Sequence, residues 1–183
     1  MIIYRFKIFI TEGFNNMKKI LLFFAITTLL TACASYTING QKVSKEEYSR
    51  WATQRVKEGI DSRRFVIDVR SMHPYRGHSR QLSSPYSLEL RGDSVISYLP
   101  YFGEARNIPY GGGKGLNFIG HLYGYEIHQV KSGLWQVMMG VENDEAKYLY
   151  VVEVFDNGSS SIHVSTQERD PISFYGEMNL EGK

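Results

Sequence analysis

The chain has 183 residues, a formal net charge of +2 and a single cysteine. When residues 1–33 are set aside, the net charge becomes about −1 and about 150 residues remain, the size of one domain. Such a nearly neutral chain, without clusters of Lys or Arg, lacks the charge pattern of a nucleic-acid-binding protein or of a polybasic membrane patch.

The first predicted element is an export signal. Residues 17–32 combine a basic start, an apolar stretch and small residues before Cys33, the order of a secretory signal peptide. Residues 1–16 precede this complete signal and are interpreted as an upstream extension; the start codon stays open between Met1 and Met17. The apolar stretch is shorter than the roughly 20 residues of a membrane-spanning helix, and no later stretch is as apolar. We therefore expect a mature chain that does not span a membrane.

A lipidation motif follows. Residues 30–33, Leu-Thr-Ala-Cys, resemble the lipobox at which bacterial lipoproteins are cut and acylated. We predict that Cys33 carries lipid, such as palmitate, and anchors the chain, because two or three acyl chains bind a membrane firmly where one is marginal. The alternative is an ordinary signal peptide cut near Ala34. The position of the only cysteine favours lipidation and excludes a disulfide within the chain.

Residues 33–42 are predicted to be a polar tether, and residues 43–183 a single antiparallel β domain. The domain begins with a predicted helix, because Ser44 and Glu47 have the spacing of a capping box. Gly59 predicts the end of this helix. The apolar residues of the segment recur at the spacing of one helix face: Tyr48, Trp51, Ala52 and Val56.

After Arg64 the apolar residues alternate with polar ones, which is typical of strands with one wet face. Three turn sequences join neighbouring strands as hairpins: residues 91–93, 131–133 and 156–158. Nine strands are predicted: residues 65–69, 87–90, 95–99, 116–119, 123–130, 134–141, 147–155, 159–167 and 172–178.

These elements predict a mainly β (α+β) fold. Short connections imply an antiparallel meander of about nine strands, which must curl into a sandwich or a partial barrel to bury its apolar face. One N-terminal helix covers it. The sequence leaves the choice between sandwich and barrel open.

No motif predicts a catalytic residue, a metal site or a cofactor. Residues 111–115 resemble a phosphate-binding loop, but Lys114 is followed by Gly115 rather than by Ser or Thr. Arg-Gly-Asp at 91–93 fits a hairpin turn better than an adhesion motif. The histidines lack the spacing and cysteine companions of a zinc site, and no nucleophile elbow is present. An enzyme remains possible but unsupported.

The segment from residue 98 to residue 115 is rich in aromatic residues and glycine. One interpretation is a ring-lined binding mouth with polar contacts. The alternative is a strand end turned by Pro100, with the rings in the core. The candidate ligand-binding residues are Tyr98, Tyr101, Phe102, Glu104, Arg106 and Tyr110.

Four motifs together resemble a known family. They are residues 98–105 before a glycine-rich stretch, Gly-x-Trp at 133–135, Phe-x-Asn-Gly at 155–158 and Ile-Ser-Phe-Tyr-Gly at 172–176. This pattern resembles the lipoproteins of Gram-negative gut bacteria called domain of unknown function 4251, over about residues 44–180. The family has no established activity, so the resemblance implies fold and compartment. Because residues 34–36 lack the acidic run of surface-exported lipoproteins, we expect an outer-membrane anchor facing the periplasm.

The preferred hypothesis is a non-catalytic binding module of the cell envelope, anchored by Cys33. Its partner would be a protein, a glycan or a small hydrophobic ligand, and not a nucleic acid. The first alternative is a carrier or chaperone for acyl chains or lipoproteins with a half-barrel pocket, which depends on analogy between folds. The second is an enzyme of unknown reaction.

Overall fold

The computed structural model describes residues 36–104 and 115–181. The signal peptide, Cys33, Arg106 and Tyr110 lie outside these ranges, so what was expected of them stays a prediction. The chain divides into two units, residues 1–37 and residues 38–183, and the second unit holds the helix and the large sheet. None of the helices in the described ranges is long and apolar enough to cross a membrane.

A short hairpin precedes the helix. Strand β1 (Tyr36–Ile38) pairs with strand β2 (Gln41–Val43). The turn between them is Asn39-Gly40, and both residues have positive φ, 50° and 78°. The sequence pattern predicted only a polar tether here. The structure adds a hairpin whose Asn-Gly turn is a strong local signal.

Helix α2 spans Lys45–Asp61 and begins as predicted. Ser44 is the N-cap, and its hydroxyl accepts a hydrogen bond from the backbone N–H of Glu47 at 3.1 Å. The helix buries one face against the barrel core. Three of its residues are buried there, two from the predicted stripe, Ala52 and Val56, and one further residue, Ile60.

The predicted helix end at Gly59 is wrong, because the helix continues to Asp61. Arg63 instead takes the left-handed conformation that ends the helix, with φ of 53°. Gly59 remains helical, and a Cβ atom there would lie 3.2 Å from the carbonyl oxygen of Arg64. The missing side chain thus allows the following strand to pass close to the helix.

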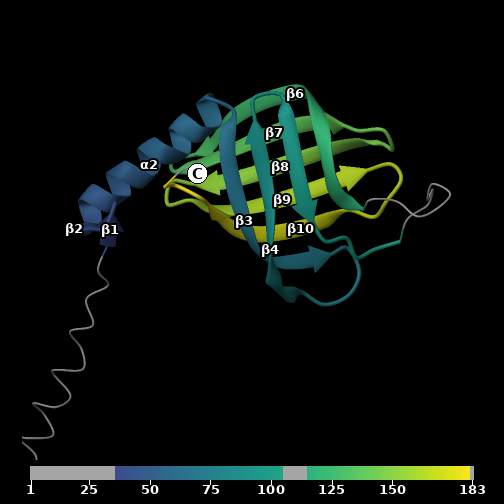
Figure 1. The fold of residues 1–183 in the computed structure, drawn as a ribbon, viewed down its shortest axis with the longest axis horizontal. Coiled ribbons are helices and arrows are strands. Elements are labelled where there is room, and N and C mark those ends of the chain that lie inside the picture. Colours follow the sequence, from purple (N-terminus) through teal and green to yellow (C-terminus); the bar gives the residue numbers. More distant parts are fainter. Residues whose placement is uncertain (1–35, 105–114, 182–183) are drawn as a thin grey trace, which may run out of the picture. The chain divides into compact units, whose positions relative to one another are not determined.

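Eight antiparallel strands form a closed barrel in which sequence neighbours pair, and the last strand pairs with the first (Figure 1). They are β3 (Arg64–Pro74), β4 (Arg80–Arg91), β5 (Ser94–Leu99), β6 (Leu116–Lys131), β7 (Leu134–Glu142), β8 (Lys147–Phe155), β9 (Ser159–Thr166) and β10 (Ile172–Met178). The predicted fold class, a mainly β fold with one helix, is confirmed. The sequence left the choice between a sandwich and a barrel open, and the structure is a barrel, closed by pairing between β10 and β3.

The barrel has eight strands where nine were predicted because residues 116–119 and 123–130 belong to one strand, β6. The apolar alternation is interrupted there by Gly120 and by a bulge between Leu122 and Gly124. The three predicted hairpin turns are present, each with a glycine at positive φ: Gly92, Gly133 and Gly158.

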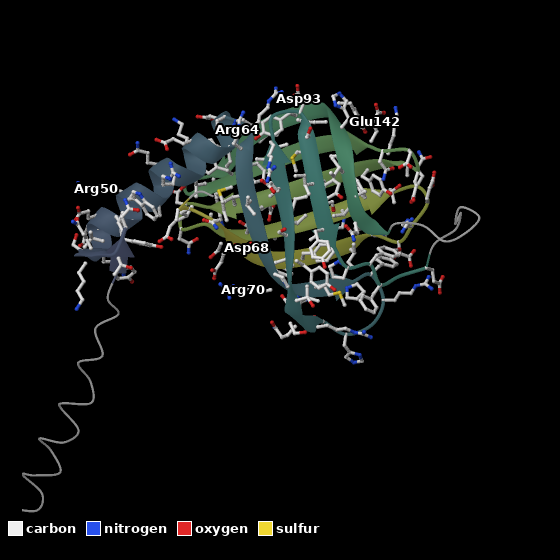
Figure 2. All side chains as sticks on the ribbon, viewed as in Figure 1. Arg50, Arg64, Asp68, Arg70, Asp93 and Glu142 are labelled. Atoms are coloured by element: carbon white, nitrogen blue, oxygen red, sulfur yellow. The ribbon has the colours of Figure 1, made fainter. Side chains whose placement is uncertain are left out.

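Side chains fill the barrel interior. Along β3, Ile67 and Val69 are buried, whereas Arg64, Asp68 and Arg70 are exposed on the outside (Figure 2). Most other strands repeat this alternation, whereas residues 80–87 of β4 and 124–131 of β6 contain no buried residue. The inward residues of the strands join one core. Examples of fully buried core side chains are Leu88, Met139, Tyr150 and Phe174.

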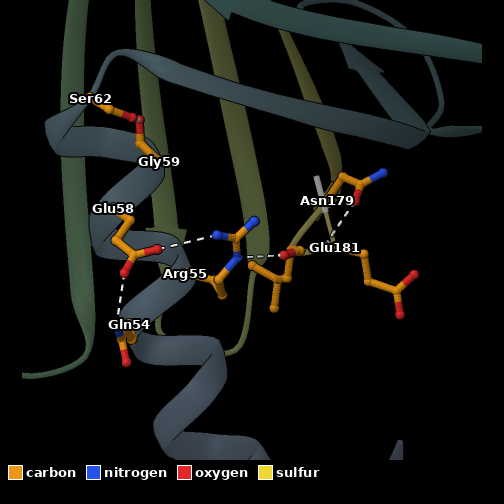
Figure 3. A network of polar contacts seen from close by, with 8 residues as sticks. Gln54, Arg55, Glu58, Gly59, Ser62, Asn179 and Glu181 are labelled. Carbon is orange, nitrogen blue, oxygen red and sulfur yellow. Dashed lines mark hydrogen bonds and ion pairs between the residues drawn. The ribbon is translucent and has the colours of Figure 1, made fainter. Parts of the chain in front are cut away.

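Helix α2 is held to the barrel by polar contacts as well as by packing. The hydroxyl of Tyr125 on β6 donates to the carbonyl oxygen of Ile60 at 2.7 Å. Arg55 Nε donates to the carbonyl oxygen of Leu180 at 2.8 Å, while Arg55 Nη1 and Glu58 form an ion pair at 3.2 Å (Figure 3). Helix α2 therefore leads directly into the first barrel strand, β3, and also contacts the residues that follow the last strand, β10.

Candidate functional site: the loop end of the barrel

The two ends of the barrel differ in their connections. Because the strands run alternately up and down, every second connection lies at the same end. One end has the tight turns at Gly92, Gly133 and Gly158. The other end, here called the loop end, has four connections: residues 75–79, 100–115, 143–146 and 167–171. Of the second of these, the structure describes residues 100–104 and 115.

Tyr98 lies on the outer wall of the barrel rather than in its mouth. It is 41% exposed on β5, next to the inward-facing Ser97. Its ring packs against that of Tyr86 on β4, with centroids 5.2 Å apart. Tyr98 is therefore accessible, but it is separated from the other predicted residues by the turn at Pro100.

Tyr101 joins two connections of the loop end. Its hydroxyl lies within hydrogen-bond distance of two carbonyl oxygens, Glu104 at 3.0 Å and Asp170 at 3.2 Å. Its ring is half-buried below the guanidinium of Arg169, 5.4 Å from the centroid. Burial raises the pKa of Tyr101, and the nearby Asp170 carboxylate raises it further. These contacts give Tyr101 a structural role within the loop end.

Phe102 and Glu104 are exposed and contact the connection between β3 and β4. The Phe102 ring is 46% exposed, and the Arg80 guanidinium lies over it, 4.8 Å from its centroid. Arg76 Nη1 lies 3.4 Å from Glu104 Oε1. These four residues, from two connections and the first position of β4, form one surface, here called the loop-end patch: Arg76, Arg80, Phe102 and Glu104.

Beside the patch lies a second group, which the sequence analysis missed. Arg169 is only 7% exposed, and its Nη2 atom pairs with Glu145 Oε2 at 3.2 Å. We call the following residues the buried polar cluster: Asn143, Glu145, Tyr148, Thr166 and Arg169. Burial raises the pKa of the Tyr148 hydroxyl, and the positive charge of Arg169 opposes that rise. In the sequence, Glu145 and Arg169 look like solvated loop charges.

Of the four predicted residues that the structure describes, the loop end brings together three, Tyr101, Phe102 and Glu104. Phe102 and Glu104 are in the patch, Tyr101 supports it, and Tyr98 lies on the wall. Arg76, Arg80 and Arg169 were missed because they come from distant parts of the chain, so no local sequence pattern joins them to residues 98–110.

A groove of about 830 Å³ lies at the opposite end, between α2, the start of β3, the end of β4 and residues 178–180. Phe65, Leu90 and Leu180 are among its apolar lining residues. Arginine and carboxylate side chains also line it, so its charges balance. None of the predicted ligand contacts that the structure describes, Tyr98, Tyr101, Phe102 and Glu104, lines this groove.

The remaining titratable groups do not form a metal site in the part of the chain that the structure describes, since no three His, Cys, Asp or Glu residues converge there. His128 and His163 are exposed on strands, as the sequence alternation indicated. The His73 ring nitrogen contacts the Ser79 hydroxyl at 2.5 Å.

The described residues define a class of protein: an eight-stranded up-and-down barrel with a helix near one end and long connections at the other. The chain belongs to the family called domain of unknown function (DUF4251), whose model matches residues 47–178. The resemblance found in the sequence is thereby confirmed.

A solved structure supports the same fold. The chain is similar to a crystal structure of a DUF4251 family protein from Bacteroides eggerthii, with a TM-score of 0.54 and 10% sequence identity. The match covers 69% of this chain and 86% of that one. A comparison with curated proteins gave no match.

Proposed function

We propose that this chain is a non-catalytic binding module of the cell envelope, anchored by lipid on Cys33 and facing the periplasm of a Gram-negative cell. The loop-end patch is its recognition surface. The anchor is supported by the lipobox at residues 30–33. The recognition surface is supported by one observation above all: a phenylalanine ring is held at the surface beneath an arginine, at the tip of the barrel.

The composition of the patch is that of a protein-recognition surface. Aromatic residues and arginine are enriched at interfaces and dominate their binding energy. Phe102 offers apolar area, while Arg76, Arg80 and Glu104 offer charged hydrogen-bonding groups around it. Strand β5 leads directly into residues 100–104, and β3 and β4 flank residues 75–79, so these strands restrict the patch before binding and reduce the entropy lost when a partner binds. We therefore favour a protein partner for the patch.

In the carrier alternative, the bound acyl chain would lie away from the loop-end patch. Leu88, Tyr150 and Phe174 are fully buried inside the barrel, so an acyl chain inside it would have to displace core side chains. The groove at the helix end has apolar residues and is the better place for such a chain. A native mass spectrum of the purified protein separates the two functions, because a co-purified lipid favours the carrier.

The patch is tested by site-specific photo-cross-linking in cells. Phe155 is a matched control, because it is also an exposed phenylalanine, 43% against 46%, and Lys131 lies over its ring at 5.9 Å. It lies next to the turn at Gly158, at the opposite end of the barrel. A cross-linker at position 102 should capture one defined protein, and a cross-linker at position 155 should not.

The capture must depend on the patch. Arg80→Ala should reduce cross-linking from position 102 several-fold, because it removes the cation over the ring. Equal capture at positions 102 and 155, or no capture at either, would contradict the proposed recognition surface.

A further inference from the structure

Strand β6 is longer than the strand beside it. β5 pairs only with residues 116–121 of β6, whereas β7 pairs with β6 as far as Lys131. In the part of the chain that the structure describes, no strand pairs with the β5 side of residues 123–131. This stretch is therefore an open edge, and every second residue along it directs its backbone N–H and C=O groups away from β7.

The outer half of this edge is accessible. Helix α2 approaches β6 at Tyr125, whose hydroxyl donates to the carbonyl oxygen of Ile60. Beyond Tyr125, all six residues 126–131 are exposed. Ile127 is 37% exposed, although isoleucine is among the residues most often buried. Pairing with β7 already holds this stretch extended, so little backbone entropy is lost when another strand pairs with it.

The middle of the edge lacks the features that usually prevent strand addition. Proteins protect an exposed edge with proline, lysine or a bulge. On β6, one bulge precedes Gly124 and another follows Gln129. Residues 124–129 between them pair regularly with β7 and contain neither proline nor lysine. Six residues span about 20 Å, which is the usual length of a strand in a sheet.

The sequence of this stretch is complementary to itself. When two copies pair antiparallel about Ile127, this residue lies opposite its own copy, and Glu126 lies opposite His128. A carboxylate then faces an imidazole N–H group twice in each pair of copies. Within one chain the two side chains already lie close, with 3.5 Å between Glu126 Oε2 and His128 Nε2.

Other registers lose this complementarity. A shift by two residues keeps the faces of the sheet matched, but it brings Glu126 opposite Glu126 or His128 opposite His128. Like charges directly opposite each other destabilise a pair of strands. The register centred on Ile127 is therefore the favoured one.

We propose that residues 124–129 of β6 form a dimerisation edge, to which a second copy of this chain adds its own β6 in the register centred on Ile127. The two barrels then share one continuous sheet. This inference goes beyond the proposed function, because β6 runs from the edge toward the tight turn at Gly133, away from the loop-end patch. Phe155 lies two strands away on β8, so failure of the dimer leaves the cross-linking comparison untouched.

Disulfide formation tests the register. The parent chain, Ile127→Cys and Gln129→Cys, all full length, are purified in detergent and oxidised. Directly opposite Cα atoms lie about 4.5–5.5 Å apart, within reach of a disulfide. Two copies of residue 129 lie about 13 Å apart in this register, beyond that reach. Ile127→Cys should therefore give about tenfold more linked dimer than Gln129→Cys, which is exposed on the same strand, or than the parent, whose only cysteine is Cys33.

A charge exchange tests the complementarity. In the Ile127→Cys chain, Glu126→Arg removes the carboxylate opposite His128 and should reduce the linked dimer several-fold. Adding His128→Glu restores opposite charges in the same register and should restore the dimer. Both side chains are exposed, so the urea midpoint of each variant should stay close to that of the parent.

Four outcomes would overturn the proposal. Ile127→Cys stays monomeric after oxidation; positions 127 and 129 link equally, as random collisions predict; or the single charge variant links as well as the double variant. In the fourth, position 127 links to a different co-purifying protein, which would mean that an extended segment of another chain occupies the edge.

Discussion

At the scale of single residues, Tyr101 and Tyr98 allow a sharp comparison. Tyr101→Phe removes a hydroxyl that serves the carbonyl oxygens of Glu104 and Asp170, so it should lower the free energy of unfolding by about 1 kcal/mol. Tyr98→Phe removes an exposed hydroxyl and should change it by less than about 0.5 kcal/mol. Urea denaturation of both variants checks this. Equal losses would show that Tyr101 does not hold the loop end together.

Buried tyrosines also predict how stability depends on pH. Burial raises the pKa of Tyr125, Tyr148 and Tyr150 above the ordinary value of 10.0. In the unfolded chain these hydroxyls ionise near pH 10, while in the folded protein they keep their protons. The unfolded state thus binds fewer protons, so stability is fully present below pH 10 and is lost as the pH rises further.

Urea unfolding at pH 8.0, 9.5 and 10.5, followed by tryptophan fluorescence, measures this loss. Tyr150→Phe should reduce the fall between the two higher pH values, because it removes one of the three groups. A free energy of unfolding that stays constant up to pH 10.5 would contradict the assignment.

The sequence located part of the site for a physical reason. Tyr101, Phe102 and Glu104 are neighbours in the chain, so a local pattern was enough to place them in one loop. Arg80 reaches Phe102 from the start of β4, and Arg169 reaches Tyr101 from the connection between β9 and β10. Such contacts depend on strand register and barrel closure, which alternation of apolar residues in one sequence does not specify.

At the scale of elements, the join between β10 and β3 depends on one glycine. Gly176 lies at the bulge in this pairing, and a Cβ atom there would clash with the Asp68 carbonyl oxygen. We expect Gly176→Ala to lower the free energy of unfolding by about 3 kcal/mol or to prevent folding, because backbone would have to move on both strands.

Gly124→Ala is the control for this substitution. Gly124 also lies in a barrel strand next to a bulge, but the atom nearest to an added Cβ is 3.8 Å away. It should unfold within about 0.5 kcal/mol of the parent. Thermal or urea melts of both variants measure these changes in stability. If Gly176→Ala were as stable as the parent, the bulge would relax at little cost.

Element types were predicted better than element ends. The capping box located the start of α2, because Ser44 and Glu47 act within one turn. The end of α2 was predicted wrongly because Gly59 does not end the helix. Its missing side chain allows the next strand to pass close by, which is a requirement of the tertiary structure. In β6 the alternation breaks at Gly120, and only the pairing with β7 shows that the strand continues.

At the scale of the whole molecule, the anchor is the part of the proposal that can be tested most directly. Cys33→Ser removes the thiol that lipidation requires, so the protein should move from the membrane fraction to the soluble fraction and lose incorporation of labelled palmitate. Fractionation with palmitate labelling measures both effects. Incorporation that persists in the variant would place the lipid elsewhere.

The pairing of β10 with β3 also has a consequence for the order in which the molecule can form. Ile67 has Met178 as its partner across this join, so the barrel stays open until nearly all of the described chain is available. If such a chain passes through a narrow channel from its N-terminus, β3 and β10 are on different sides during transit. The barrel then cannot close and block the channel. Contacts between such distant residues also slow folding. This topology is compatible with the export proposed above, in which the chain would cross a membrane unfolded and fold on the other side.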